Sequence, residues 1–155
     1  MSLQNYTNRK YDYLAFQKVD ISKEAQLGLA LYDEDTSGKI CTGIQKLAQR
    51  WALEFLTEQG SMLHLPQRGC EFMTLVRFGR LRNRSDVASA FVAANLTVAR
   101  NMQLEEYPNM LDDERLGAAE LANVSIQPGY LDLRVIIVSR AGNSRAIIVP
   151  VETLP

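Results

Sequence analysis

The clearest pattern of apolar positions in the chain predicts a helix between residues 42 and 60. Apolar side chains recur at the three- and four-residue offsets of one helical face, at Ile44, Leu47, Ala48, Trp51, Phe55 and Leu56. Thr42 and Gln45 have the spacing of a capping box, and Gly60 stands where a left-handed residue would end the helix. Both ends of this helix are therefore marked in the sequence.

A second helix is predicted from about Asp86 to Gln103, with Ser85 as its N-cap. Its main apolar stripe consists of Val87, Phe91, Ala94, Val98 and Met102. Val92 and Leu96 lie off this stripe. We therefore expect the helix to be covered on two sides.

Short strands are predicted at residues 11–16 and 26–32, and again at 62–65 and 71–76 between the two helices. Residues 112–122 have acids at their start and are expected to form a short third helix. A strand at 123–127 and a terminal hairpin complete the elements. Helices framed by strands, with antiparallel pairs at the end, indicate an α+β fold with a small mixed or antiparallel sheet.

The hairpin is predicted in residues 131–155, where two runs of branched aliphatic residues flank Gly142 and Asn143. These two residues suit a type II′ loop, which would place Val138 opposite Ile147 and Val135 opposite Pro150. Because proline has no N–H to donate, the ladder is expected to stop or bulge there. Residues 131–134 would then have no local partner on that edge.

Both faces of the first hairpin strand are apolar near the turn, so one layer of helices cannot cover them. One interpretation is an internal strand between helices and other strands. The other is a sheet that strands from other chains complete, because an exposed apolar edge otherwise invites aggregation. Arg140 and Arg145 are expected to face each other across the turn, and an acidic partner surface would relieve their repulsion.

The 155 residues, 46% of them hydrophobic, suit one domain, expected at 11–155 after a flexible N-terminal arm at 1–10. With 17 basic and 18 acidic residues, the net charge of -1 provides no broad field for a polyanion. Cys41 and Cys70 are expected to be reduced thiols. No stretch is apolar enough for a membrane span, so we expect a soluble protein made in the cytosol.

Three groups of residues resemble parts of metal-binding or catalytic sites, but none predicts such a site. The run from Asp33 to Gly38 imitates the first half of a calcium loop, but Ile44 replaces the bidentate acid at its end. His64, the sole histidine, is expected to be a partly buried strand residue. Glu54 and Glu58 are expected on the polar face of the first helix. We therefore expect no enzyme activity, cofactor or metal.

The strongest local charge lies in residues 77–84, where Arg77, Arg80, Arg82 and Arg84 surround Phe78. These side chains suit phosphate contacts with a base stacked on the ring, which would make the chain a nucleic-acid-binding or packaging accessory protein. Arginine-rich loops are equally typical of solvated connections and of protein interfaces. The residues alone leave these alternatives open.

Residues 42–151 resemble the baseplate wedge or sheath-initiator family of contractile phage tails, with its lysozyme-like baseplate wedge fold. The matching positions are Leu56, Thr57, Gly60, Met62, Pro66 and Gly69, followed by Gly129 with Leu131, Leu133, Val135 and Ile137. The family's Glu-Pro-Arg motif is not intact, because Glu114 and Arg115 stand together without the proline. This departure puts the usual role of the motif in doubt.

The resemblance implies a structural subunit of the virion that is made in the bacterial cytoplasm and present in several copies in the tail. Its partners would be the tail sheath protein, other baseplate wedge proteins and the tail tube, without membrane or nucleic acid. Strands of the sheath would pair with residues 131–151, which include Leu131, Leu133, Val135 and Ile137. The polar contacts expected at this interface are Arg80, Arg82, Arg84, Glu114, Arg115, Arg140 and Arg145.

Overall fold

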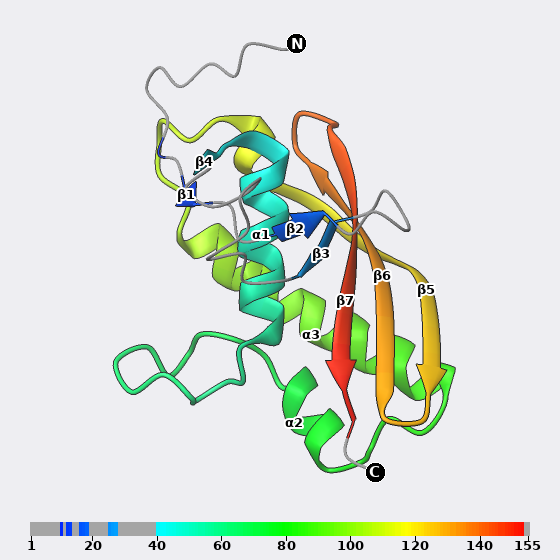
Figure 1. Cartoon of the computed structure of the whole chain (residues 1–155). Coiled ribbons are helices and arrows are strands. Elements are labelled where there is room, and N and C mark those ends of the chain that lie inside the picture. The colour runs from blue at the N-terminus through cyan, green and yellow to red at the C-terminus, as the bar shows by residue number, and fades with distance from the viewer. Residues whose placement is uncertain (1–9, 11, 14–15, 19–24, 28–39, 154–155) are drawn as a thin grey trace.

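The α+β fold is confirmed in a computed structural model that describes residues 10, 12–13, 16–18, 25–27 and 40–153 (Figure 1). For residues 16–18 and 25–27 only the backbone is described. The calcium-like run and parts of the first two predicted strands lie outside these residues. The elements are β1 Asp12–Tyr13, β2 Phe16–Lys18, β3 Ala25–Leu27, β4 Ile40–Cys41, α1 Gly43–Leu56, α2 Phe72–Arg77, α3 Arg84–Leu104, the 3-10 turn η1 Asp112–Glu114, β5 Leu116–Gln127, β6 Tyr130–Ser139 and β7 Ser144–Glu152.

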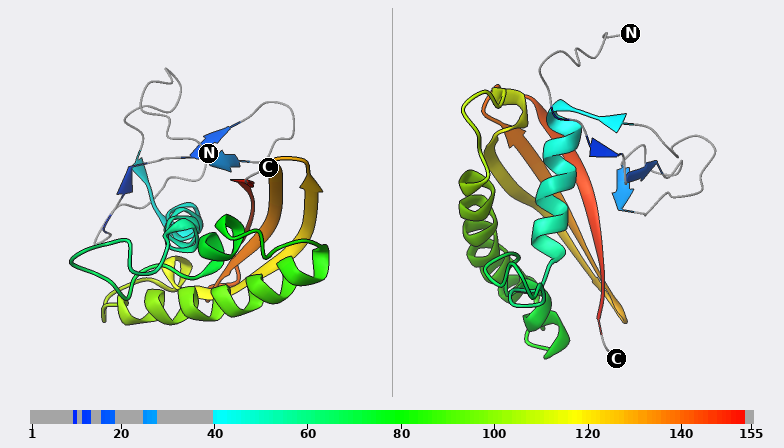
Figure 2. Two further views of the ribbon diagram at one scale, coloured as in Figure 1. Left: turned by 90° about the horizontal axis from the view of Figure 1, so that it is seen from below. Right: turned by 90° about the vertical axis from the view of Figure 1, so that its left-hand side faces the viewer.

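The main sheet has the strand order β2-β3-β7-β6-β5. β5, β6 and β7 form a continuous antiparallel unit, whereas β3 pairs with β7 in parallel through Ala25 with Ile147 and Gln26 with Ile148. β1 and β4 form a separate two-stranded sheet. In Figure 1, α3 crosses behind β7, β6 and β5, and the right panel of Figure 2 shows α3 and the β2–β3 pair on opposite sides of the molecule.

The hydrophobic core lies between one face of the sheet and the helices. Alternate residues of β6 and β7 are buried there, because successive side chains of a strand point to opposite faces. Trp51 and Phe55 of α1 stack with ring centroids 4.8 Å apart, and Phe55 meets Phe72 of α2 at 4.7 Å. Fully burying each such ring contributes about 1.5–3 kcal/mol. The opposite face of β6, including Ile136 and Val138, is only half-buried.

The two long helices lie where periodicity predicts them, but their caps differ. Thr42 is the N-cap of α1 without a side-chain hydrogen bond, and Thr57 rather than Gly60 ends the helix. Asn83, not Ser85, caps α3, and its side-chain oxygen accepts a 2.9 Å hydrogen bond from the Asp86 N–H. The capping box and the predicted Gly60 cap are therefore wrong.

The apolar stripe predicted for the second helix is buried in α3, but the opposite side of the helix is exposed. All five residues of the stripe face the core. Val92 and Leu96 are 60% and 69% exposed, so within the described part of the chain only one side of α3 is covered. The prediction of two covered sides is wrong for these residues.

Three of the short elements were assigned incorrectly. Residues 62–65 form turns instead of a strand, and residues 72–77 form the helix α2. The predicted helix at 112–122 is a 3-10 turn followed by β5. The alanines of this segment favour a helix, but pairing along β6 outweighs that preference, since β propensity depends mainly on what a strand packs against.

The terminal hairpin exists, but its predicted register is shifted. Val135 lies opposite Ile147 instead of Pro150, and Val138 lies opposite Ser144. The strands are joined by four residues, 140–143, and a 2.8 Å hydrogen bond runs from the Ser139 N–H to the Asn143 oxygen. Gly142 has a φ of 82°, which suits this longer loop as well as a two-residue turn.

Pro150 does not interrupt the ladder, because it lies opposite Asp132. The Thr153 N–H donates a 3.0 Å hydrogen bond to the Gly129 oxygen, and the pair 139/143 is also hydrogen-bonded. The hydrogen-bonded pairs of this ladder therefore involve the odd-numbered residues of β6. Asp132 is even-numbered, so its pair with Pro150 is a non-hydrogen-bonded pair, in which Pro150 needs no N–H. Residues 131–134 pair with both β5 and β7, so the predicted unpaired edge is wrong.

Candidate partner interface

The apolar residues predicted for strand pairing face the core. Leu131, Leu133, Val135 and Ile137 are all buried. Their backbone lies between β5 and β7, so it has no open edge to offer a partner. The prediction that residues 131–151 receive foreign strands through these four residues is therefore wrong for β6.

Glu114 is also turned inward, which corrects its prediction as a surface contact. Its side chain is only 2% exposed. One carboxylate oxygen accepts a 3.1 Å hydrogen bond from the Gly43 N–H at the start of α1, and the other accepts a 2.7 Å bond from Lys46 Nζ. The Lys46 ammonium also donates to the carbonyl of Lys10. Glu114 thus supplies the N-terminal cap that Thr42 does not provide, across a large separation in sequence.

Arg115 and Arg140 lie beside a common acid of the same chain. Glu106 is 3.2 Å from Arg140 and 3.9 Å from Arg115, measured between nitrogen and oxygen atoms. Arg115 also donates a 3.3 Å hydrogen bond to the Tyr107 carbonyl. Arg145 is half-buried and pairs with Ile137, so it does not face Arg140 as predicted. Arg115 and Arg140 therefore hold the β6–β7 loop against the segment before β5.

The arginine segment is the part of the predicted interface that remains exposed. Arg77 ends α2 and pairs with Glu58 at 2.5 Å. Arg80, Arg82 and Arg84 are exposed and have no ion pair within the described part of the chain. Phe78 beside them is 68% exposed. The segment thus connects α2 to α3 and carries three arginines that no described acid pairs with.

An open backbone edge lies on β5 instead of on β6. β5 pairs with β6 alone among the described strands, so its other edge is unpaired there. Its register shifts at two places, between Leu116 and Ala118 and between Leu121 and Asn123. Such bulges bend an edge strand and partly protect it from other chains. Residues 123–127 continue as a regular stretch beyond the second shift.

A buried carboxylate that the sequence did not reveal fixes the loop between α1 and α2. Glu54, predicted on a polar face, is buried, and its oxygens accept hydrogen bonds of 2.8 Å from the Gly69 N–H, 2.8 Å from the Asn101 amide and 2.7 Å from Arg68 Nε. A Cβ on Gly69, whose φ is +84°, would lie 2.2 Å from the Thr57 oxygen. Only glycine fits this loop, and no periodicity in the sequence indicates the network.

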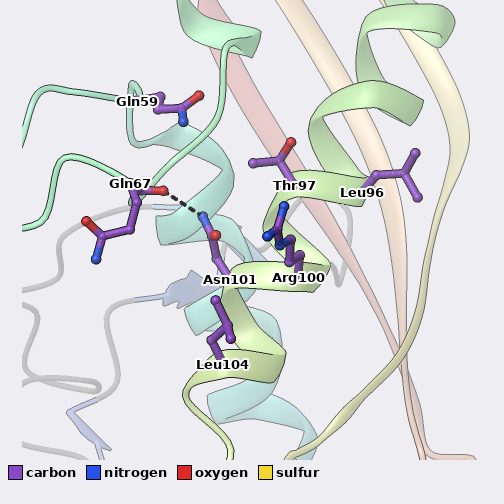
Figure 3. Close-up of a pocket in the computed structure, with 7 residues that line it drawn as sticks. All are labelled: Gln59, Gln67, Leu96, Thr97, Arg100, Asn101 and Leu104. Carbon is purple, nitrogen blue, oxygen red and sulfur yellow. Dashed lines mark hydrogen bonds between the residues drawn. The ribbon is translucent and has the colours of Figure 1, made fainter.

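Shallow hollows line the exposed side of α3, and Leu96 contributes to two of them. One, of about 390 Å³, is lined by Gln59, Gln67, Leu96, Thr97, Arg100, Asn101 and Leu104 (Figure 3). The other, of about 420 Å³, lies between α3 and β5 and includes Val92, Leu96 and Glu120. Leu96 lines both hollows, and neither contains the convergent acids or histidines of a catalytic cleft.

The described residues contain little reactive chemistry. Cys41 and Cys70 are free, and burial raises the pKa of each thiol to about 11, which disfavours the nucleophilic thiolate. His64 lies in an exposed loop, which corrects its prediction as a buried strand residue.

Within the described ranges, no group of His, Cys, Asp and Glu side chains has the arrangement of a metal site. Nor does any helix there have the length and apolar character to cross a membrane.

Comparisons with family models, curated proteins and solved structures found no match to this chain.

Proposed function

We propose that this chain is a structural component of a contractile phage tail baseplate, and that it nucleates the sheath by accepting strands from neighbouring chains at the edge of its sheet. The proposal takes the class of assembly from the resemblance over residues 42–151. It differs from the sequence-based prediction in the strand that accepts the partner. That strand is β5 instead of β6.

The observation that supports this proposal is the unpaired edge of β5. β5, Leu116–Gln127, pairs with β6 along one edge, and no described strand pairs with its other edge. Two backbone groups of β5 are bonded by side chains, because the Ala119 carbonyl accepts from Asn95 Nδ2 at 3.0 Å and the Val124 N–H donates to Asn123 Oδ1 at 2.9 Å. Glu120 is the sole charged side chain on the strand, so few charges oppose the approach of another chain. An added strand would gain main-chain hydrogen bonds and extend the antiparallel unit.

Amide hydrogen exchange tests this proposal. Residues 123–127 have amides that point alternately to β6 and to the open edge. In the free subunit, the amides on the open edge are expected to exchange quickly, and in assembled tails they should exchange at least tenfold more slowly. Equal rates in both states would contradict strand addition at β5.

A pair of proline variants provides the functional test. Consecutive N–H groups point to opposite edges, so Ser125→Pro and Ile126→Pro each remove a donor from a different edge. The variant that breaks a β6 bond is identified by its lower unfolding temperature. The other variant keeps its stability and is expected to stop sheath assembly, seen by electron microscopy. Normal contractile tails with that stable variant would reject the mechanism.

The second candidate function is nucleic-acid binding through the arginine segment, defined as residues 77–84. Three exposed arginines without ion pairs in the described part of the chain, next to the exposed ring of Phe78, favour it. Binding to DNA should then weaken steeply with salt. Replacing Arg80, Arg82 and Arg84 by glutamine should abolish it, while the β5 proline variants leave it unchanged.

A further inference from the structure

The exposed side of α3 carries an apolar ridge that no described segment of the chain covers. Val92, Leu96 and Leu104 are 60%, 69% and 75% exposed, and they follow one another with Arg100 at four-residue spacing. This spacing places the four side chains in one row along the helix. The row extends about 18 Å at 1.5 Å per residue. We refer to these four residues as the α3 ridge.

The α3 ridge has a hollow on each side. Leu96 lines the hollow toward β5 and also the hollow toward the loop that contains Gln59 and Gln67. Figure 3 shows Leu96, Arg100 and Leu104 along α3 beside that loop. A ridge of i±4 side chains between two grooves is the surface that helices use when they pack against each other.

The charges near the α3 ridge define the chemistry of its partner. Arg100 is exposed and has no ion pair within the described residues. The residues that line its hollow include no acid. Glu120 lies in the opposite hollow. A partner with an acid on one side and a base on the other would match both charges and would fix its own orientation.

We propose that the α3 ridge binds an amphipathic α-helix of another protein, with apolar residues packed along Val92, Leu96 and Leu104 and a carboxylate paired with Arg100. A small molecule would fill one hollow and leave most of the ridge exposed. An extended strand would pair with the backbone edge of β5 instead of packing along the side chains of α3, which has no free backbone groups. The inference rests on side chains of α3, whereas strand addition uses the backbone of β5, and the hollow between α3 and β5 borders both surfaces.

The proposal can be tested with a labelled synthetic amphipathic helix of about five turns that has leucines on one face and one central glutamate. Fluorescence anisotropy of the full chain with this peptide gives the Kd. Leu96→Lys is expected to weaken binding at least tenfold. Arg100→Glu should also weaken it, and a twin peptide with lysine in place of the glutamate should restore binding to this variant. Leu63→Lys, at an 86% exposed leucine of the α1–α2 loop, is the matched control and should leave the Kd unchanged.

Because Leu96 and Arg100 are exposed, both variants should unfold at the temperature of the parent chain. Lack of binding by either peptide, or equal binding by all variants, would overturn the proposal. Self-association of the chain in sedimentation, removed by Leu96→Lys, would also overturn it, because a second copy would then be the occupant. Strand addition at β5 is read out separately by hydrogen exchange, so each proposal can fail without the other.

Discussion

Two buried carboxylates connect segments that are far apart in the sequence. Glu54 joins α1 to the loop before α2 and to Asn101 of α3, and Glu114 joins η1 to the start of α1. A buried carboxylate is costly unless its oxygens are hydrogen-bonded and its charge is paired. Both acids meet this condition, Glu54 with Arg68 and Glu114 with Lys46. Their role is to position backbone.

Removing the charge of Glu114 should destabilise the fold strongly. Glu114→Gln would leave the Lys46 ammonium, whose side chain is 8% exposed, without its carboxylate. We expect the free energy of unfolding in urea to fall by about 3 kcal/mol. The exposed Glu152→Gln is the control and should change it by less than about 0.5 kcal/mol.

A second substitution distinguishes the loss of the Lys46–Glu114 ion pair from other effects of the glutamine side chain. Adding Lys46→Met to Glu114→Gln removes both charges, so part of the lost stability should return. A loss below about 1 kcal/mol for Glu114→Gln alone would contradict the role assigned to this pair.

At the scale of elements, the start of α3 depends on one side chain. The Asn83 oxygen accepts from the Asp86 N–H, whereas Ser85 lies inside the helix and is exposed. Asn83→Ala should therefore lower the free energy of unfolding by about 1 kcal/mol. Ser85→Ala should change it by less than about 0.5 kcal/mol. Equal effects of the two substitutions in chemical denaturation would show that the cap is elsewhere.

Periodicity predicted the elements whose burial depends on a repeating face. α1 and α3 are long enough for this repeat to be read, and their stripes are buried except for Ile44 and Leu56 of α1, which are half-buried. α2 has only six residues, so its apolar run suited a strand equally well. The end of β5, residues 123–127, was predicted as a strand, but its first part was predicted as a helix. The alanines there favour a helix, and only pairing with the later β6 decides the conformation.

The interface was harder to predict than the elements. Arginines of residues 77–84 are exposed as expected for their type, but Glu114 is buried against the usual preference of glutamate for the surface. Its partner Lys46 lies on α1, and no spacing in the sequence relates the two. The hairpin register failed for a similar reason, since Gly142 suits loops of several lengths.

At the scale of the whole molecule, the two buried thiols make stability depend on alkaline pH. Burial raises the pKa of Cys41 and Cys70 from 9.0 to about 11. Above pH 9 the unfolded chain loses these protons while the folded chain keeps them, so the free energy of unfolding falls up to about pH 11. The slope is on the order of 1 kcal/mol per pH unit for each thiol.

Denaturation in urea between pH 8 and pH 11 measures this dependence. Lysines and tyrosines also titrate in this range, so the parent chain must be compared with Cys41→Ala/Cys70→Ala. The double variant is expected to have a clearly smaller slope, whatever its stability at neutral pH. Parallel curves for the two proteins would contradict the assignment to the thiols.

The hydrogen bond between the Gly43 N–H and Glu114 spans 71 positions of the chain. During synthesis, the first turn of α1 emerges from the ribosome long before the carboxylate that completes it. A nascent chain that stops before η1 should therefore have a frayed first turn in α1, and the helix should become fully ordered only when the later segment has been translated. The order of translation thus delays completion of this helix until η1 has been made, after both α2 and α3.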